Sequence, residues 1–327
     1  MLLLMNRDDI IAGFEKEKNS YVLRFEKKER MPIGFQTLEN WLKRRNGGSH
    51  NGYLYSLMKK YHCDEEKEFL SLTHAVSLND TFWVKNKTES LCWNDVSPYQ
   101  NYFSEPISKL AFEGTGDFEE AVINSDSKAC FPELTTEGSF RKCWRKENGK
   151  IFLYKQGESG ARNVGLEPYS EILGAELAQK ICPEAVFYTQ AELYGKTASK
   201  CQLFTSEQYG YVPMFHFRPN GASVNDLIHF YQNIESENAF RRMLVLDALT
   251  FQVDRHMGNF GVLVDNSSLK ILKMAPVFDL NLSCLPYVEQ EEFSKIGQKL
   301  LDYGPRIGND FLRTGQEVLY TKDIFIP

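Results

Sequence analysis

The chain has 327 residues and a formal net charge of −6, and 25% of its residues are charged. This length exceeds what a single hydrophobic core usually organises, so it predicts two or three packed lobes. Hydrophobic residues make up 42% of the sequence, an ordinary share for a soluble globular protein. The negative charge argues against a nucleic-acid-binding surface, because such surfaces are basic. We therefore expect no direct nucleic-acid partner.

The sequence carries no signal for membrane insertion or export. No stretch is long and apolar enough to cross a bilayer, and the opening run MLLLM is too short for the apolar core of a signal peptide. The seven cysteines are scattered and include no C-x-x-C pair, which indicates reduced thiols rather than disulfides or a structural zinc site. These features predict a cytoplasmic protein that does not bind membranes.

Residues 1–120 are predicted to form a mainly helical N-terminal domain that recognises a substrate or partner. The stretches TLENWLKRR at 37–45 and YLYSLMKKY at 53–61 carry apolar residues at helical spacing. SLNDTFWV at 77–84 indicates a short turn and strand. The polar, glycine-containing stretch at 112–128 is predicted to be the linker to the next domain.

A small β-rich lobe is predicted over residues 121–208 and a helical lobe over 209–327. Alternating residues at 133–157 predict strands with a hairpin turn at Glu147-Asn148-Gly149. Pro168 suits the first turn of a helix at 167–181. The remaining predicted elements are strands at 184–195 and 200–207, helices from 221 onward, and a hairpin formed by 260–266 and 269–281.

The hexapeptide DRHMGN, residues 254–259, follows the apolar helical stretch MLVLDALTFQV and carries the chemistry of the chain. Phosphoryl transfer from ATP needs a carboxylate to orient the attacking hydroxyl, ligands for magnesium and a cation on the phosphates. An aspartate followed by four residues and an asparagine supplies the first two. Asp254 is therefore predicted to be the catalytic base and Asn259 a magnesium ligand.

A second magnesium ligand and the phosphate-binding cation follow from the flanking elements. Asp279 lies at the far end of the predicted hairpin, which would return the chain to the same metal ion. Lys155 ends the alternating strand IFLYK and should hold its ammonium group inward. Glu167 and Glu171 lie four residues apart on one helix face, and either could pair with Lys155. We favour Glu171, which lies deeper in the helix.

Two further stretches are predicted to contact the nucleotide. Backbone N–H groups near Gly138 could cover the phosphates, with hydroxyl groups from Thr135, Thr136 and Ser139 nearby. The stretch LFTSE at 203–207, which ends the strand-like segment at 200–207, would contact adenine through its backbone, as the hinge of a kinase does. These hinge residues are Phe204, Thr205, Ser206 and Glu207.

Three residues are predicted to support the catalytic loop. His256 is assigned to the ATP site, and its favoured role is to order the loop through a backbone hydrogen bond. Asp247 lies on an apolar helix face and is interpreted as a buried structural brace, because a buried carboxylate needs a partner. Arg255 could pair with Asp279, with a phosphorylated residue or in a surface salt bridge, and the sequence leaves these alternatives open.

From about residue 130 onward the chain resembles the HipA-like serine/threonine protein kinases, relatives of the phosphoinositide kinases. DRHMGNFG and FDLN correspond to the catalytic loop and metal-binding aspartate of that family, and TTEG to its short phosphate-binding loop. The resemblance implies an α+β, two-lobed protein-kinase-like fold with an additional mainly helical N-terminal domain. It implies Asp254 as base, Asn259 and Asp279 as Mg²⁺ ligands, and ATP bound by Lys155 and the 135–139 loop.

The resemblance also implies regulation and partners. A hydroxyl group of the phosphate-binding loop can be autophosphorylated in this family, which points to Thr135 or Ser139, and a phosphate there would repel ATP. The implied partners are a protein substrate, such as a translation component, and a helix-turn-helix antitoxin. Two alternatives remain: a lipid or small-molecule kinase on the same fold, and a nucleotide-binding regulatory partner without catalysis.

Overall fold

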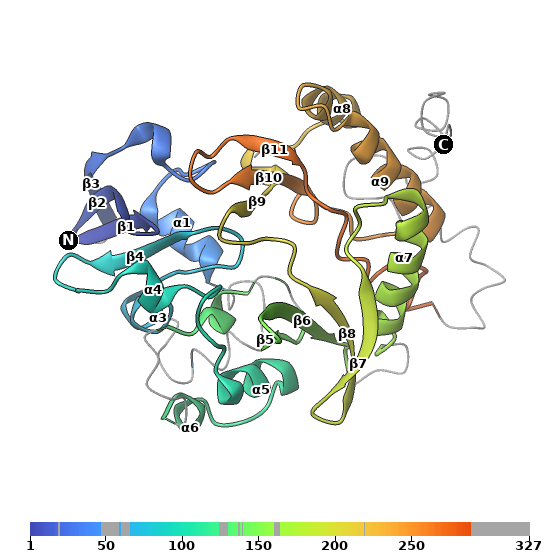
Figure 1. Ribbon diagram of the computed structural model, residues 1–327, viewed down its shortest axis with the longest axis horizontal. Helices are drawn as coiled ribbons and strands as arrows, with labels where there is room; N and C mark the ends of the chain where they lie inside the picture. The colour runs from blue at the N-terminus through green and yellow to red at the C-terminus, as the bar shows by residue number, and fades with distance from the viewer. Residues whose placement is uncertain are drawn as a thin grey trace. The chain divides into compact units, whose positions relative to one another are not determined.

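The computed structural model describes residues 1–288 except 19, 47–58, 60–65, 124–129, 137, 139, 160–163 and 219. The chain divides into two compact units, shown with all elements in Figure 1. Unit 1 comprises Met1–Tyr154 together with Thr205–Gly210 and Asp265–Lys270. Unit 2 comprises Lys155–Phe204, Tyr211–Val264 and the chain from Ile271 onward. Two short segments from late in the sequence therefore belong to the N-terminal unit.

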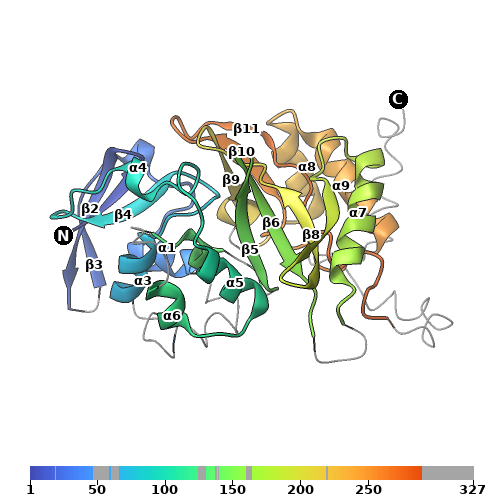
Figure 2. The same cartoon turned by 60° about the horizontal axis from the view of Figure 1, so that its bottom comes forward.

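Unit 1 begins with an antiparallel sheet whose strand order is β3-β2-β1-β4. The helices Leu38–Arg45 and Glu66–Thr73 lie on one face of this sheet, as Figure 2 shows, and Leu4 of β1 shares an apolar cluster there with Trp41 and Phe69. Leu3 and Met5 belong to a second apolar cluster on the other face. The strands are β1 (Leu2–Asn6), β2 (Asp9–Glu17), β3 (Ser20–Glu26) and β4 (Phe82–Asn86).

The prediction of a mainly helical N-terminal domain is therefore wrong, because residues 1–86 contribute a whole sheet. A strand that is covered on both faces has no polar alternation, and the run Leu2–Met5 is accordingly continuously apolar. Such a short run does not distinguish a strand from a helix by its periodicity. The strand predicted within 77–84 is confirmed as β4.

The helices of unit 1 follow the predicted pattern in part. The helix predicted at 37–45 is confirmed as α1, and Thr37 caps it by accepting a hydrogen bond from the backbone N–H of Asn40. The predicted helix at 53–61 lies outside the described residues except for Lys59, and the predicted linker contains α6. The helices are α1 (Leu38–Arg45), α3 (Glu66–Thr73), α4 (Trp93–Val96), α5 (Glu105–Glu113) and α6 (Phe118–Ile123), with 3-10 turns η1 (Lys28–Arg30) and η3 (Pro132–Thr135).

The hairpin predicted around Asn148, the helix at 167–181 and the strand within 184–195 are confirmed, whereas the strand predicted at 200–207 lies at Lys196–Gln202 and residues 133–135 belong to a 3-10 turn. Asn148 and Gly149 both have positive φ, 50° and 77°, which suits the tight hairpin turn between β5 and β6. Four strands form a sheet of order β5-β6-β8-β7. Their bounds, with that of the intervening helix, are β5 (Lys142–Glu147), β6 (Lys150–Gln156), α7 (Glu167–Ile181), β7 (Tyr188–Leu193) and β8 (Lys196–Gln202).

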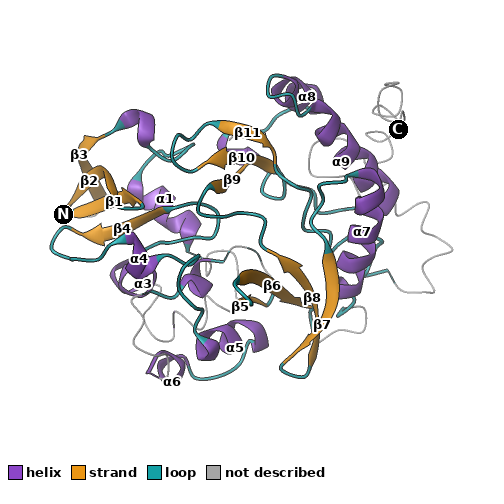
Figure 3. Ribbon diagram, viewed as in Figure 1, coloured by secondary structure: helices purple, strands orange, loops and turns teal. Residues whose placement is uncertain are grey.

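The later part of unit 2 combines helices with a hairpin, and the helices and hairpin predicted there are confirmed. Figure 3 shows α7 and α9 side by side. None of the helices in the described part of the chain is long and apolar enough to cross a bilayer. The remaining elements are β9 (Tyr209–Pro213), η4 (Met214–His216), α8 (Val224–Gln232), α9 (Glu237–Thr250), β10 (Gly261–Asp265) and β11 (Ile271–Met274), with sheet order β11-β10-β9.

The described cysteines are all free thiols, as the sequence predicts, and Cys63 lies outside the described residues. Burial raises the pKa of Cys143, Cys182 and Cys201 to about 12. These thiols therefore stay protonated at neutral pH, and protonated thiols are poor nucleophiles.

Gly261 opens β10 at a point where β9 passes closely. A Cβ atom at this position would lie 2.1 Å from the carbonyl oxygen of Val212 and 2.9 Å from the Cα of Pro213. Because both are backbone atoms, no side-chain rotation relieves the clash. We expect Gly261→Ala to lower the free energy of unfolding by about 2 kcal/mol, measured by urea denaturation.

Gly149→Ala is the control for Gly261→Ala. Gly149 has a positive φ but nothing within 4 Å of an added Cβ, so its substitution adds backbone strain without a clash. A Gly261→Ala protein as stable as wild type would contradict the close approach of the two strands.

Candidate active site

Lys155 forms a buried cluster with two carboxylates in unit 2. The residue is 5% exposed, and Nζ lies 2.5 Å from Oε1 of Glu171 on α7 and 2.6 Å from Oδ1 of Asp279. The ammonium group also lies 5.9 Å from the centre of the Tyr188 ring. Three elements distant in sequence thus converge on one cation.

The two glutamates at the start of α7 have different partners. Glu171 is fully buried, and besides Lys155 its carboxylate accepts a hydrogen bond from Oγ of Ser199 at 2.5 Å. Oε2 of Glu167 instead accepts from the backbone N–H of Gly165 at 2.9 Å and of Glu158 at 3.2 Å. The ion pair with Lys155 therefore belongs to Glu171, while Glu167 holds the loop before α7.

The electrostatics of the cluster keep Lys155 charged. Burial alone would lower the pKa of Lys155, but Asp279 and Glu171 together raise this pKa above its ordinary value. Burial raises the pKa of the Glu171 carboxyl group, and the neighbouring ammonium group partly offsets this rise. With both carboxyl groups ionised, one cation faces two anions, and the excess negative charge favours an additional cation at the exposed side of Asp279.

Asp279 occupies an unusual backbone conformation. Its φ is 58°, in the left-handed region that non-glycine residues rarely adopt, although aspartate tolerates it better than most residues. Its backbone N–H donates to Oη of Tyr188 at 3.3 Å, and its carbonyl oxygen accepts from Nε2 of Gln252 at 2.9 Å. These contacts hold the aspartate in a conformation that the chain alone would not favour.

The catalytic loop is closed by its own hydrogen bonds. Nδ2 of Asn259 donates to the carbonyl oxygen of Asp254 at 3.0 Å, so the amide oxygen of Asn259 is the atom left to accept or to bind a cation. The backbone N–H of Asp254 donates to Oε1 of Gln252 at 3.2 Å. Since Nε2 of Gln252 donates to the backbone carbonyl oxygen of Asp279, this one buried amide joins the loop to the backbone of Asp279.

Arg255 lies at the centre of the same region. It is fully buried, and its guanidinium group binds both carboxylate oxygens of Asp247 on α9 at 3.0 and 3.1 Å. Its Nη1 donates to the carbonyl oxygens of Asn259 and Phe278, each at 2.8 Å. The prediction that Asp247 is a structural brace is confirmed, and the alternative of a surface salt bridge for Arg255 is wrong. A reading of local sequence did not reveal that these two residues are partners.

His256 orders the loop through a backbone hydrogen bond. Its Nδ1 lies 3.0 Å from the backbone nitrogen of Gly258 and accepts that N–H. Its backbone N–H donates to the carbonyl oxygen of Asp254, and its own carbonyl oxygen accepts from Asn259. The favoured prediction for this histidine is confirmed at the level of its hydrogen bond.

The residues of this site suit magnesium. The carboxylate of Asp279 and the amide oxygen of Asn259, the two predicted ligands, are hard oxygen donors of the kind that Mg²⁺ prefers. Within the described residues, no group of three histidine, cysteine, aspartate or glutamate side chains gathers as a self-contained metal site. Proteins usually bind magnesium through one or two carboxylates together with the phosphates of a substrate.

The predicted phosphate-binding stretch belongs to unit 1, and its hydroxyl groups have protein partners there. Thr135 ends η3, is 5% exposed, and donates to the carbonyl oxygen of Pro132 at 2.8 Å. Oγ1 of Thr136 accepts from Nε1 of Trp144 at 2.9 Å. Gly138 has a φ of 100°, and the ammonium group of Lys142 lies against its open side. Ser139 lies outside the described residues.

The predicted hinge residues differ in what their side chains contact. Oγ1 of Thr205 donates to the carbonyl oxygen of Leu78 at 2.5 Å, and Oγ of Ser206 accepts from the backbone of Gln208 and Tyr209. Oε1 of Glu207 accepts hydrogen bonds from Trp93, Ser97 and Gln100. The side chains of Thr205 and Glu207 thus bind other parts of unit 1, and the backbone carbonyl oxygens of Ser206 and Glu207 accept hydrogen bonds from Nδ2 of Asn266.

Phe204 belongs to an aromatic cluster of unit 2 that the sequence analysis missed. Its ring lies 5.7 Å from that of Tyr211 and 5.3 Å from that of Phe278, and the cluster includes buried Leu263 and Ala275. Oη of Tyr211 donates to the carbonyl oxygen of Gly258 at 2.8 Å, so the cluster is fastened to the catalytic loop. One signal in the sequence could have revealed this cluster: Phe278 directly precedes Asp279, which is a predicted magnesium ligand.

The chain resembles solved kinase structures in its fold. No protein-family model matches it, and no curated protein sequence matches it significantly. The proinflammatory kinase CtkA of Helicobacter pylori is 20% identical with a TM-score of 0.41 over 50% of this chain, which spans 64% of the length of that kinase. HipA of Shewanella oneidensis MR-1, solved with HipB and its operator DNA, is 14% identical with a TM-score of 0.54, covering 100% of this chain and 92% of HipA. At the level of the fold, the chain is therefore similar to HipA of a toxin–antitoxin system.

Proposed function

We propose that the chain is an ATP- and Mg²⁺-dependent serine/threonine protein kinase of the HipA-like class. The observation that carries the proposal is the convergence of Lys155, Glu171 and Asp279 beside the loop of Asp254 and Asn259. Phosphoryl transfer requires this combination of a paired lysine, two magnesium-binding positions and a carboxylate near the acceptor. The similarity of the fold to HipA supports the same class.

Each residue has a defined role in this proposal. Asp254, which is half-buried, accepts a hydrogen bond from the substrate hydroxyl and orients it toward the phosphorus atom. Lys155 binds the nucleotide phosphates, and Glu171 holds the ammonium group in place. Asn259 and Asp279 would hold magnesium, which when bound neutralises charge on the transferred phosphoryl group.

Further residues complete the proposed ATP site. The loop of Thr135, Thr136, Gly138 and Ser139 would cover the phosphates, and His256 orders the catalytic loop. The backbone of residues 204–207 would contact adenine. Autophosphorylation of Thr135 would require η3 to open, because its hydroxyl group is buried and bound to Pro132. The opening of η3 is consistent with the proposal that the phosphorylated loop moves out of the ATP site.

The domains and partners are proposed on the same basis. Residues 1–120 would recognise a substrate or partner, 121–208 would bind ATP, and 209–327 would carry the catalytic loop. The HipA structure contains the antitoxin HipB, which supports a helix-turn-helix antitoxin as a partner of this chain. The substrate would be a cytoplasmic protein, with a translation component as the class that the resemblance suggests.

A transfer assay tests the proposed function. The purified chain is incubated with labelled ATP and Mg²⁺ and with protein, phosphoinositide or sugar acceptors, and phosphosites are mapped by mass spectrometry. We expect label on serine or threonine of the chain itself or of a protein acceptor. Removal of Mg²⁺ with EDTA should stop the transfer, because Asn259 and Asp279 act on the phosphates through the metal.

Two other results would contradict the protein-kinase proposal. Label found on a lipid or sugar and absent from protein would indicate a kinase with a different acceptor on the same fold. ATP binding without any transfer would indicate a nucleotide-binding regulatory partner.

A further inference from the structure

The β10–β11 hairpin connects the two proposed magnesium ligands. Asn259 lies two residues before the start of β10, and Asp279 lies five residues after the end of β11. The strands of the hairpin belong to unit 2, but its tip, Asp265–Lys270, belongs to unit 1. Contacts that hold the tip therefore act on the hairpin that connects Asn259 and Asp279.

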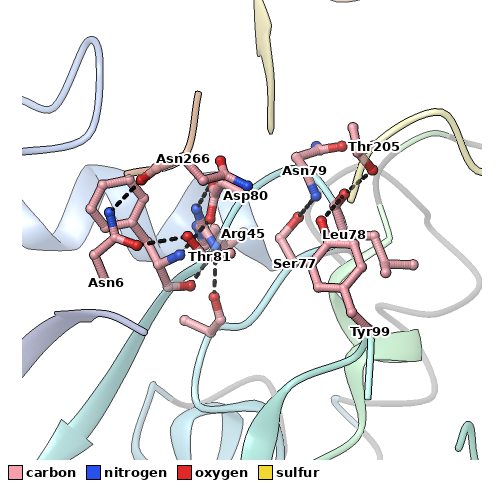
Figure 4. Close-up of polar contacts among 12 residues, drawn as sticks. Asn6, Arg45, Ser77, Leu78, Asn79, Asp80, Thr81, Tyr99, Thr205 and Asn266 are labelled. Atoms are coloured by element: carbon pink, nitrogen blue, oxygen red, sulfur yellow. Dashed lines mark hydrogen bonds and ion pairs between the residues drawn. The ribbon is translucent and has the colours of Figure 1, made fainter. Parts of the chain in front are cut away.

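The tip is fixed by one buried asparagine, Asn266, which is 1% exposed. Its Nδ2 lies 3.1 Å from the carbonyl oxygens of both Ser206 and Glu207, and its backbone N–H donates to the carbonyl oxygen of Gln208 at 3.0 Å. Its own carbonyl oxygen accepts from Nδ2 of Asn6 at 2.8 Å, as Figure 4 shows. Asn266 thus joins the tip both to the end of the predicted hinge, with the residue that follows it, and to the first strand of the chain.

Asn6 is itself held in place by the N-terminal sheet. It ends β1, is 4% exposed, and its Oδ1 accepts a hydrogen bond from Oγ1 of the buried Thr81 at 2.6 Å. The neighbouring Asp80 is bound in turn by Arg45, whose guanidinium group also donates to the carbonyl oxygens of Ala75 and Phe82 (Figure 4). The partner of Asn266 is therefore part of the packed framework of unit 1 and has little freedom to move.

The fit around Asn266 leaves no room for adjustment. A Cβ atom at Gly210 would lie 2.4 Å from Oδ1 of Asn266 and 2.8 Å from the carbonyl oxygen of Asn79. A glycine at this position lets the two segments approach closely, which an ordinary surface turn would not require.

The turn itself does not need Asn266. Oδ1 of Asp265 accepts from the backbone N–H groups of Ser267 and Ser268 and from Oγ of Ser268, at distances from 2.7 to 3.1 Å. These bonds form a local aspartate turn that closes the hairpin by itself. The side chain of Asn266 points away from this turn into unit 1, so its buried hydrogen bonds serve the attachment of the tip.

We propose that Asn266 and Asn6 are positioning residues for the magnesium ligands, an inference that rests on the proposed function. By docking the hairpin tip on the N-terminal sheet and on residues 205–210, they set the spacing of Asn259 and Asp279 through the two strands. Buried polar networks of this kind specify one arrangement, because any other arrangement leaves amide groups unsatisfied.

Asn266→Ala and Asn6→Ala test the proposal through the magnesium dependence of ATP binding, measured by calorimetry at a temperature where both variants are folded. We expect each variant to need about tenfold more Mg²⁺ for half-maximal ATP binding, as is typical when residues behind metal ligands are removed. Ser108→Ala is the matched control, since Ser108 is a buried polar residue of unit 1 that donates to Glu133 and Trp144. It should lower the unfolding temperature without changing the magnesium dependence.

Hydrogen exchange tests the docking without nucleotide, so failure of the docking is distinguishable from failure of the proposed function. In Asn6→Ala we expect faster exchange of the backbone amides of 265–270, although the substitution lies in the first strand. Ser267→Ala, at an exposed position of the same turn, should leave this exchange unchanged. Unchanged exchange in Asn6→Ala, or a magnesium dependence in Asn266→Ala equal to that of Ser108→Ala, would overturn the proposal.

Discussion

Asp254→Asn is expected to slow phosphoryl transfer by about 10²–10⁴-fold while the chain remains folded. The carboxylate orients the acceptor hydroxyl and takes up its proton, and an amide of the same shape can do neither. Two backbone hydrogen bonds of the residue are kept in the variant, from its N–H to Gln252 and from Asn259 to its carbonyl oxygen. We therefore expect the loop to keep its conformation in the Asp254→Asn protein. Single-turnover transfer from labelled ATP measures the loss, and thermal unfolding measures the fold.

The matched control for Asp254→Asn is Asp226→Asn. Asp226 is an aspartate of the same unit, in the capping box of α8, and its carboxylate binds the backbone and side chain of Ser223. It should retain wild-type transfer. An Asp254→Asn protein with full activity would show that a different residue acts as base, and an unfolded one would show that the carboxylate serves the fold.

The spacing of polar residues predicted that Asp279 returns to the loop of Asp254 and Asn259, and hydrogen bonds through Gln252 and Arg255 join these segments. Asp254 and Asn259 lie in the loop after α9, and the β10–β11 hairpin that follows brings the chain back toward this loop at Asp279. This arrangement depends on neighbouring segments of the sequence and not on distant ones. The choice between Glu167 and Glu171 also followed from depth in a helix. The hydrogen bonds of Glu167 to the loop before α7 explain why the other glutamate is left for Lys155.

Features that depend on distant parts of the chain were not predictable in this way. The N-terminal sheet was missed because a strand covered on both faces shows no alternation. The partnership of Arg255 with Asp247 and the bridge made by Gln252 depend on the angle at which α9 meets the loop, which sequence spacing does not encode. Segments 205–210 and 265–270 join the N-terminal unit by hydrogen bonds to residues up to 260 positions away, as between Asn6 and Asn266.

Arg255→Met is expected to lower the free energy of unfolding by about 3–5 kcal/mol, because it leaves the carboxylate of Asp247 buried without a cation. Methionine fills much of the volume of arginine, so the loss reports the charge and the hydrogen bonds more than a cavity. The carbonyl oxygens of Asn259 and Phe278 lose a donor at the same time. Transfer activity should therefore fall as well, even at temperatures where the variant is folded. Urea denaturation measures the stability.

The control for Arg255→Met is Arg241→Met, which removes an arginine from the same helix region. Arg241 pairs with Glu237 four residues away at a more exposed position, and such pairs contribute at most about 1 kcal/mol. The double variant Asp247→Asn with Arg255→Met should be more stable than Arg255→Met alone, because no unpaired charge remains buried. If Arg255→Met cost no more than Arg241→Met, the buried pair would not be what joins α9 to the catalytic loop. A large loss that Asp247→Asn partly restores would show that the charge pair itself holds this junction, and with it the position of Asn259.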